Sequence, residues 1–377
     1  MTVATRNCYL GADLFRLLTA VATDETTLQE AVGNLVTTVD RSHVSRRLDA
    51  IAAELERTAP DLVGLQEVAL VRTDEPDDAS TPTATNVRYD FRTTLLAAIE
   101  ERNLPYRPVA ATKTADFQLP AVVDGDRMGV RLTDHDVILA RDGVTTGDPT
   151  TGTFDAAFSM TRSGQTVTIR RGYGIVAATV GGTRLTFCNT HLESVSAEAR
   201  RAQAAELQGL LDDHENPTVL VGDLNSGPGA TTDVYDALAG AFTDAAPEVG
   251  NTCCHASTLR NATPSLDSRV DHTLVRGDLR ATEATRVGAD PATRIAVDDE
   301  RLWPSDHAGV VTTLTPASAV TTATPTETPT TSPTPDITVT PTATPELSAA
   351  SGPGFGVAAG ALSVLAALAA RGQHDDD

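Results

Sequence analysis

Residues 217–226, with the sequence PTVLVGDLNS, constrain the fold more than any other stretch of the chain. Residues 219–221 form an apolar run between a proline and a glycine, a pattern typical of a β-strand that is buried on both faces. Asp223 and Asn225 follow two residues apart, so their side chains point to the same side of an extended backbone. A strand-to-loop junction built on Asx turns explains this pair equally well, so its meaning depends on the rest of the chain.

A second segment repeats this order of buried strand and polar residue. Residues 42–58 predict a helix, because apolar residues recur from Leu48 to Leu55 at i, i+3, i+4 and i+7. Residues 61–68 then predict a strand with Glu67 at its end. A glutamate directly after a buried strand is costly to desolvate unless it is paired or bound to a metal.

The remaining elements follow from similar patterns. Further helices are predicted over 91–103, 197–213 and 234–242, and further strands over 3–10, 136–140, 174–180, 183–193, 270–275 and 308–314. Ser196 is expected to cap the helix at 197–213, and the glycine pair 181–182 predicts a hairpin turn. Residues 73–86 lack periodicity and predict a solvated loop, with a substrate-covering lid as the alternative.

The charge composition bears on the conditions in which the protein works. Its net charge is −22 and Lys113 is its only lysine, which suggests a protein of high-salt surroundings; an ordinary solubility charge is the alternative. At molar salt the Debye length is about 3 Å, so this charge does not exclude a polyanionic substrate. The sequence also lacks the basic stripe with interleaved aromatic residues that marks a dedicated nucleic-acid binder.

The four cysteines do not form a zinc motif. Cys8, Cys188, Cys253 and Cys254 have no CxxC spacing, and the adjacent pair beside His255 suits a tetrahedral metal ion poorly. We expect buried thiols or a disulfide, with the pairing left open.

The composition changes after the strand at 308–314. Residues 316–351 are rich in Thr and Pro and nearly free of charge, so they predict an extended, disordered stalk. The tail at 352–377 predicts a short apolar helix over 356–370, which is shorter than the roughly 20 residues that span a membrane. A sorting tail that is removed fits this pattern, with a weakly membrane-seeking helix as the alternative. Residues 1–315 remain as the expected catalytic domain.

Polar groups stand at the ends of nearly all the predicted buried strands. They are Asn7, Glu67, His191, Asp223, Asn225, Asp271, Asp306 and His307. Oxygen ligands without thiolates select a hard ion such as Mg²⁺ or Mn²⁺, and histidines add proton transfer or charge stabilisation near neutral pH. This set predicts metal-assisted attack of water on a phosphate ester.

The same residues carry a family resemblance. The order of six motifs resembles that of the endonuclease/exonuclease/phosphatase superfamily, the deoxyribonuclease I-like fold. The motifs are Asn7, Gln66-Glu67, residues 189–192, residues 222–225, Asp271 and residues 305–307. The resemblance covers about residues 1–315. It implies an α/β fold, a four-layer sandwich of two mostly antiparallel sheets packed face to face with helices outside. The site is then expected at one edge of the sandwich.

The resemblance also implies a role for each residue. Glu67 would bind Mg²⁺ directly with Asn7 and Asp306 nearby, and Asp223 would orient or deprotonate the attacking water.

The other roles concern the phosphate. Asn225 and His191 would hold the phosphoryl oxygens, with His191 also a candidate to protonate the leaving group. His307 would stabilise the pentacoordinate phosphorus, with Asp271 fixing its tautomer. Arg171 stands where the family often places a cation that contacts the phosphate.

The tail resembles the PGF-CTERM sorting signal of haloarchaeal surface proteins, with Pro353-Gly354-Phe355 after the stalk. This resemblance implies an extracellular, surface-anchored protein and a sorting peptidase as a partner. Two features depart from the pattern: the basic end is a single Arg371 followed by three aspartates, and residues 1–10 lack the features of a secretory signal. We expect the protein to act as a monomer.

These inferences lead to a Mg²⁺-dependent phosphodiesterase, acting as a nuclease or on a phospholipid headgroup. Sphingomyelinase or phospholipase C-like activity and phosphomonoesterase activity are the alternatives within the family, because the fold alone does not choose the substrate. A non-catalytic surface binding module is the alternative from another class, and the complete set of polar residues argues against it.

Overall fold

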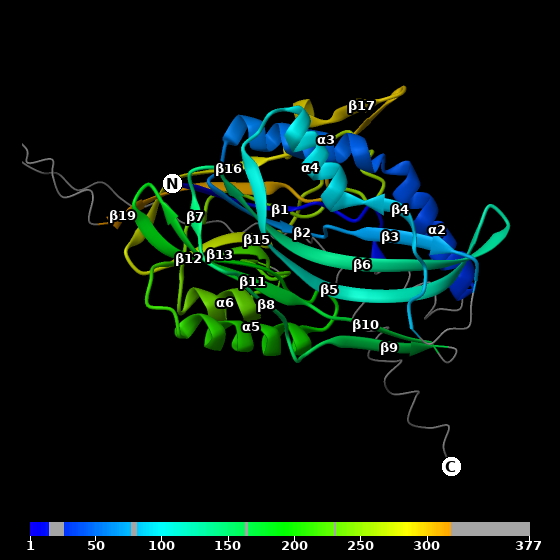
Figure 1. The fold of residues 1–377 in the computed structure, drawn as a ribbon, viewed down its shortest axis with the longest axis horizontal. Coiled ribbons are helices and arrows are strands. Elements are labelled where there is room, and N and C mark those ends of the chain that lie inside the picture. Colours follow the sequence, from blue (N-terminus) through cyan, green and yellow to red (C-terminus); the bar gives the residue numbers. More distant parts are fainter. Residues whose placement is uncertain (15–25, 77–80, 163–164, 230, 318–377) are drawn as a thin grey trace, which may run out of the picture. The chain divides into compact units, whose positions relative to one another are not determined.

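The computed structural model describes residues 1–14, 26–76, 81–162, 165–229 and 231–317 (Figure 1). These ranges fall within one structural unit, Met1–Val320. The predictions for the stalk beyond residue 317 and for the tail at 352–377, with its sorting signal, lie outside the described residues. None of the helices in the described ranges is long and apolar enough to cross a membrane.

Two large sheets contain most of the described strands. The first has eight strands, in the order β16 (Leu279–Val287), β19 (Gly309–Pro316), β1 (Thr2–Asn7), β2 (Leu62–Gln66), β6 (Asp126–Arg141), β3 (Leu70–Asp74) and β4 (Asn86–Asp90), with β5 (Tyr106–Val123) also paired to β6. The second has seven, in the order β14 (Thr243–Asp244), β15 (Asp271–Arg276), β13 (Thr218–Asp223), β12 (Thr183–His191), β11 (Gly172–Val180) and β7 (Thr145–Thr146), with β8 (Thr150–Thr153) also paired to β11. Two hairpins stand apart: β9 (Phe158–Arg162) with β10 (Gln165–Ile169), and β17 (Ile295–Val297) with β18 (Glu300–Leu302).

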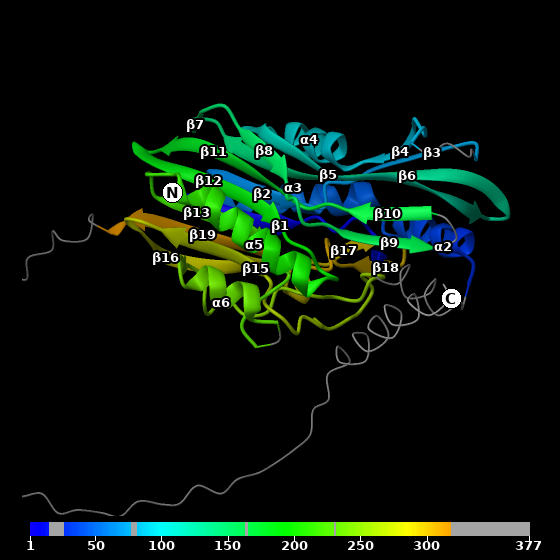
Figure 2. The same ribbon diagram turned by 90° about the horizontal axis from the view of Figure 1, so that it is seen from below.

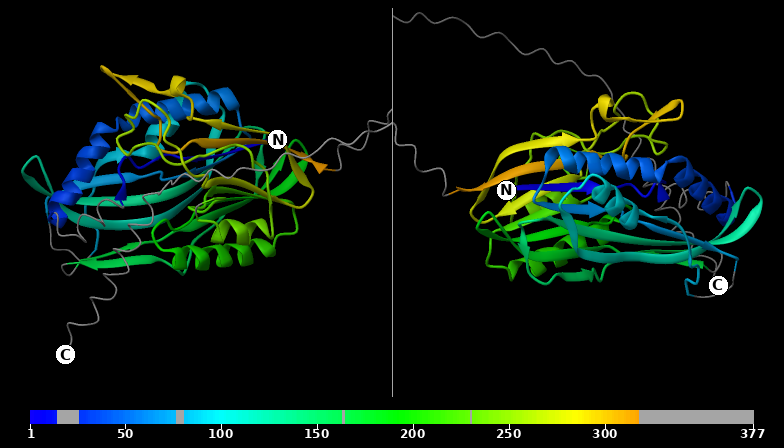
Figure 3. Two further views of the ribbon diagram at one scale, coloured as in Figure 1. Left: turned by 180° about the vertical axis from the view of Figure 1, so that it is seen from behind. Right: turned by 45° about the horizontal axis from the view of Figure 1, so that its top comes forward.

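The helices cover the outer faces of the two sheets (Figures 1 and 2). On the first sheet lie α2 (Leu28–Arg41), α3 (Val44–Thr58) and α4 (Phe91–Glu101); on the second lie α5 (Ala197–Asp212) and α6 (Asp233–Ala239). A single 3₁₀ turn, η1 (Pro291–Thr293), precedes β17. The view from behind in Figure 3 shows the same order of helix, sheet, sheet and helix. The predicted four-layer α/β sandwich is confirmed.

Alternation of side chains along the strands explains the layers. In β6, Ile138 and Ala140 pack between the two sheets, whereas Val137 and Leu139 pack against the helices of the first sheet. Because side chains of a strand alternate between its faces, one apolar strand supplies both cores. Phe187 of β12 is fully buried in the inter-sheet core.

One parallel strand pair in each sheet positions the site. In the described sheets β1–β2 and β12–β13 run parallel, and the other paired strands run antiparallel. A parallel pair needs a crossover, and α2 with α3 provides it in the first sheet while α5 provides it in the second. The carboxyl ends of all four strands therefore carry their polar residues to one edge of the sandwich.

Local signals in the sequence account for several helix boundaries. The Ser196 hydroxyl accepts a hydrogen bond from the Ala199 amide, so the predicted cap of α5 is confirmed. The helix α2 was not predicted, although Thr27 and Glu30 form a capping box at its start.

The hairpin of β5 and β6 also extends well beyond the predicted strand at 136–140. Its outer part carries polar residues such as Asp116 and Arg131, which pair across the strands, so the sequence lacks an apolar run there. The predicted loop at 73–86 lies between β3 and β4 and takes in their ends, with residues 77–80 outside the described ranges.

Candidate active site

Strand register brings the predicted residues into line. In the second sheet His191 pairs with Asp223, and Asp223 pairs with Asp271. In the first sheet Asn7 pairs with Gln66, one residue before Glu67. The Asn7 side chain crosses between the sheets, since its Nδ2 donates to Asp223 Oδ2 at 3.1 Å.

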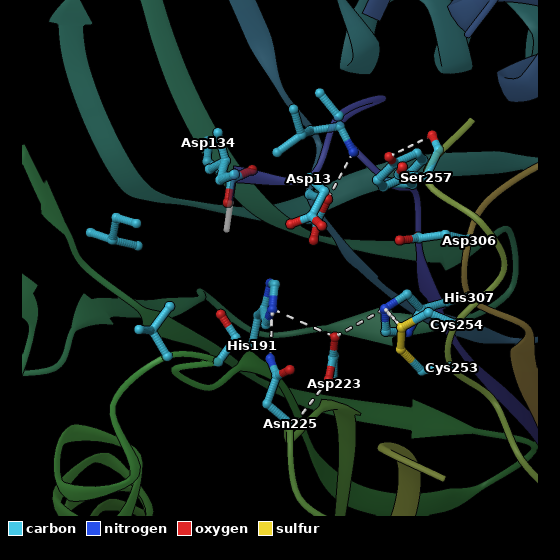
Figure 4. Close-up of a pocket in the computed structure, with 18 of the residues that line it drawn as sticks. Asp13, Asp134, His191, Asp223, Asn225, Cys253, Cys254, Ser257, Asp306 and His307 are labelled. Atoms are coloured by element: carbon cyan, nitrogen blue, oxygen red, sulfur yellow. Dashed lines mark hydrogen bonds and ion pairs between the residues drawn. A yellow bond between two sulfur atoms is a disulfide. The ribbon is translucent and has the colours of Figure 1, made fainter. Parts of the chain in front are cut away.

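A cavity of about 500 Å³ opens at this edge of the sandwich (Figure 4). Seven of the predicted site residues line it: Glu67, Arg171, His191, Asp223, Asn225, Asp306 and His307. The other two, Asn7 and Asp271, are fully buried and contact residues of the lining. Residues spread over three hundred positions thus meet around one space.

Glu67 is held by two donors and points to the cavity. Asn7 Nδ2 donates to its Oε1 at 3.2 Å, and the Leu10 amide donates to its Oε2 at 2.8 Å. Asn7 Oδ1 accepts from the Tyr9 amide at 2.8 Å, which fixes the orientation of the Asn7 amide group. Asn7 therefore serves as a donor to two carboxylates, and this orientation does not support its predicted role as a metal ligand.

Asp306 completes a pair of carboxylates suited to a hard ion. It lines the same cavity as Glu67. Burial raises the pKa of Asp306 to about 7; His307 opposes this shift, and the carboxylates of Glu67 and Asp223 add to it. Two carboxylates that line one cavity fit a divalent cation, which would relieve their mutual repulsion.

Asp223 occupies the centre of the site. Its Oδ1 accepts from the Asn225 amide at 2.9 Å. Its Oδ2 lies 3.5 Å from His191 Nε2 and 3.7 Å from His307 Nε2, as Figure 4 shows. Burial raises the pKa of Asp223 to about 6, with His307 opposing the shift and Asp271 adding to it. A carboxylate with such a pKa can accept a proton near neutral pH.

His307 is oriented and charged by its neighbours. Its Nδ1 lies 2.8 Å from Asp271 Oδ2, so Nδ1 carries a proton and Nε2 faces Asp223. Burial alone would lower the pKa of His307, but Asp271, Asp223 and Asp306 together raise it well above its usual range. The predicted pairing of Asp271 with His307 is present in the structure.

His191 differs from His307 because a guanidinium faces it. Arg171 Nη1 lies 3.0 Å from His191 Nδ1, and since a guanidinium only donates, Nδ1 must accept. Burial lowers the pKa of His191 well below its usual range, and the charges of Arg171 and His307 add to this effect. A neutral imidazole is a poor acid, so this geometry does not support His191 as the proton donor to a leaving group.

We expect the pKa of His191 to rise when Arg171 is replaced by methionine. Removing the guanidinium removes one of the charges that disfavour the imidazolium, although burial still opposes it. NMR titration of the histidine ring signals in both proteins measures the shift. An unchanged His191 titration in the variant would show that Arg171 does not control its charge.

Sequence reasoning expected buried thiols or a disulfide without placing them at the cavity, and it missed one acidic residue of the lining. Cys253 and Cys254 form a disulfide that lines the cavity, with Cys254 Sγ 3.8 Å from His307 Nε2. Asp134 of β6 also lines it. The sequence offered a signal for each, in the adjacent cysteines and in the Asp134-His135-Asp136 triplet. The fold decides which cysteines pair and which aspartate side chain faces the cavity. Cys8 and Cys188 are buried free thiols.

The fold and the site together define a class of protein. Paired carboxylates, oriented imidazoles and amide donors around one cavity are the groups that hydrolyse phosphate esters. The model of the Endonuclease/Exonuclease/phosphatase family matches residues 33–307, more than half of the chain, and the chain belongs to this family. It is therefore an enzyme of the phosphate-ester hydrolase class.

Solved structures share the fold at low sequence identity. The mannosyl-6-phosphatase of Bacteroides thetaiotaomicron is 17% identical, with a TM-score of 0.52 over 84% of this chain and 99% of that chain. An endonuclease/exonuclease/phosphatase of Bacteroides vulgatus is 16% identical, with a TM-score of 0.52 over 84% and 98%. One of Beutenbergia cavernae is 22% identical, with a TM-score of 0.50 over 84% and 71%. No curated protein matches the chain. These likenesses establish the fold alone.

Proposed function

We propose that the protein hydrolyses phosphate esters with Mg²⁺, through in-line attack of water on phosphorus. One observation carries this proposal: Asp223 lies between His191 and His307 in the cavity that Glu67 and Asp306 also line. A base, two imidazoles and a pair of carboxylates are thus within reach of a single phosphate group.

Glu67 and Asp306 are the residues that would hold the cation. The two carboxylates line one cavity, and an all-oxygen donor set suits Mg²⁺ or Mn²⁺. When bound, the ion supplies Lewis-acid polarisation of a phosphoryl oxygen. Asn7 holds Glu67 toward the cavity through its hydrogen bond.

The other residues act on the water and the phosphate. Asp223 accepts the proton of the attacking water, for which its raised pKa suits it. Asn225 and the neutral His191 bind phosphoryl oxygens, and Arg171 adds a positive charge at this end of the cavity. His307, held as an imidazolium by Asp271, stabilises the negative charge that develops at phosphorus.

The lining of the cavity bears on the substrate. Among the described residues of the lining Arg171 is the one arginine or lysine, and part of this lining is apolar, including Leu10, Phe117, Leu132 and Ile169. An extended polynucleotide needs several cationic contacts. This lining supports a phosphodiester with one apolar substituent, such as a phospholipid, as the candidate beside the nuclease-like activity. Plasmid nicking, phosphocholine release from lipid and phosphate release from a sugar phosphate distinguish nuclease, phospholipase C-like and phosphomonoesterase activity.

We also propose a location from the sequence of the tail. The likeness of residues 352–377 to a sorting signal supports a surface-anchored protein whose tail a peptidase removes. Mass spectrometry of the mature protein tests this: we expect its C-terminus to precede the apolar run, and an intact tail would contradict the proposal.

Removing the metal is expected to abolish activity. We expect hydrolysis of a bis-aryl phosphate in molar salt to stop on addition of a chelator and to return with excess Mg²⁺ or Mn²⁺, because without a cation the carboxylates of Glu67 and Asp306 repel the phosphate. The initial rate under the three conditions is the measurement. Undiminished hydrolysis in chelator would contradict the metal-dependent mechanism.

A further inference from the structure

Two aspartates of β6, Asp134 and Asp136, lie on the strand face between the sheets, and the first of them reaches the cavity. Asp134 and Asp136 stand in the same alternation as Ile138 and Ala140, whose side chains pack between the two sheets. Asp134 lines the cavity, and Figure 4 shows it on the side away from His307. None of the roles proposed above uses either residue.

Their oxygens are buried and mostly without partners. Asp134 is 8% exposed and Asp136 is 2% exposed. Thr114 donates to Asp134 Oδ2 at 3.2 Å. In the described ranges no group donates to Asp134 Oδ1 or to either oxygen of Asp136. A buried carboxylate without donors is costly unless a cation or a proton compensates it.

Within the described part of the chain, Arg171 is the nearest positive charge to these aspartates, and it is shared with other carboxylates. Arg171 is the guanidinium that they share, and it also faces Glu193, whose Oε2 lies 3.7 Å from its Nε, and Glu67. His191, the neighbour of Arg171, is neutral for the reasons given above. One guanidinium thus faces four carboxylates, and the cation proposed above is assigned to Glu67 and Asp306, so the inference that follows rests on the proposed function.

We propose that Asp134 and Asp136 bind a second hard divalent cation, Mg²⁺ or Mn²⁺, at the Arg171 end of the cavity. Three oxygens without donors on one strand face offer the anionic ligands, and water or a substrate oxygen fills the remaining positions. Thr114 donates a hydrogen bond to Asp134 Oδ2 and so orients the Asp134 carboxylate without binding the cation itself. This cation neutralises the part of the site that the ion at Glu67 does not reach.

The test counts Mn²⁺ ions bound to the full chain, by electron paramagnetic resonance and calorimetry. We expect two ions per chain in the wild type, one in Asp136→Asn and one in Glu67→Gln. Asp134→Asn is expected to weaken one site by roughly tenfold or more rather than remove it, because Asp134 has one oxygen without a donor whereas Asp136 has two. Asp116→Asn is the matched control, because this carboxylate on the paired strand β5 already binds Arg131 at 2.7 Å, and it should keep both ions.

Thermal unfolding separates bound metal from bound protons. If a cation binds here, Asp136→Asn raises the Tm of the metal-free protein but reduces the rise in Tm that saturating Mn²⁺ produces. If the aspartates are instead neutralised by protons, the variant keeps the wild-type count of ions and the full Mn²⁺ effect, and the proposal is overturned. A wild-type count of one ion, lost in Glu67→Gln, would overturn this second site and leave the proposed hydrolase intact.

Discussion

Asp223→Asn is expected to lower the turnover of phosphate-ester hydrolysis by at least about 10²-fold, the size found when a general base is removed. The amide keeps the shape of the side chain but cannot accept the proton of water. Because burial raises the pKa of Asp223 to about 6, its ionised form strains the fold, so the variant should be no less stable than the wild type. Turnover and Tm measured on the same samples check both expectations.

Asp244→Asn is the matched control for this change. Asp244 lies in the same sheet, is nearly buried and pairs with Arg269 at 2.7 Å, but it does not line the cavity. We expect it to lose stability and keep its turnover. Equal turnover in Asp223→Asn and the wild type would remove Asp223 from the mechanism.

His307→Ala is expected to produce a loss of similar size. The change removes the positive charge nearest to Asp223, and a preorganised charge of this kind is worth about 10²–10³-fold in turnover. His272→Ala is its control, since His272 is equally buried on β15 but binds the Ser226 carbonyl outside the cavity. A wild-type rate in His307→Ala would contradict the role of the imidazolium.

Asp271→Asn tests the positive charge of His307 while the His307 side chain stays in place. Asp271 is the nearest carboxylate to this ring and raises its pKa, so the variant lowers that pKa. The imidazolium is then lost at a lower pH, and the basic limb of the pH–rate profile should move to lower pH. A profile that keeps the wild-type basic limb would show that Asp271 does not hold the charge.

Local pattern in the sequence predicted the buried strands and the polar residues after them, whereas the four-layer sandwich and a site at its edge were predicted from the family resemblance. Buried strands such as residues 219–221 are visible as apolar runs, and the polar residue after each run is visible too. Their convergence follows from parallel pairs that end at one edge. The polar hairpin of β5 and β6 had no such run, and it was predicted only in part.

The sequence could not predict the contacts that set charge and orientation. The approach of Arg171 to His191 depends on pairing between β11 and β12, which places Gly172 opposite His191. The same holds for Asn7, whose amide orientation depends on the Tyr9 backbone. Such contacts change the assigned roles without changing the residue list.

The position of the cation tests the central claim most directly. Crystals grown with Mn²⁺ should give an anomalous peak at about 2.0–2.3 Å from a Glu67 carboxylate oxygen, with Asp306 and the cavity on its other side. A protein active in Mn²⁺ whose crystals show no peak beside Glu67 would contradict the account.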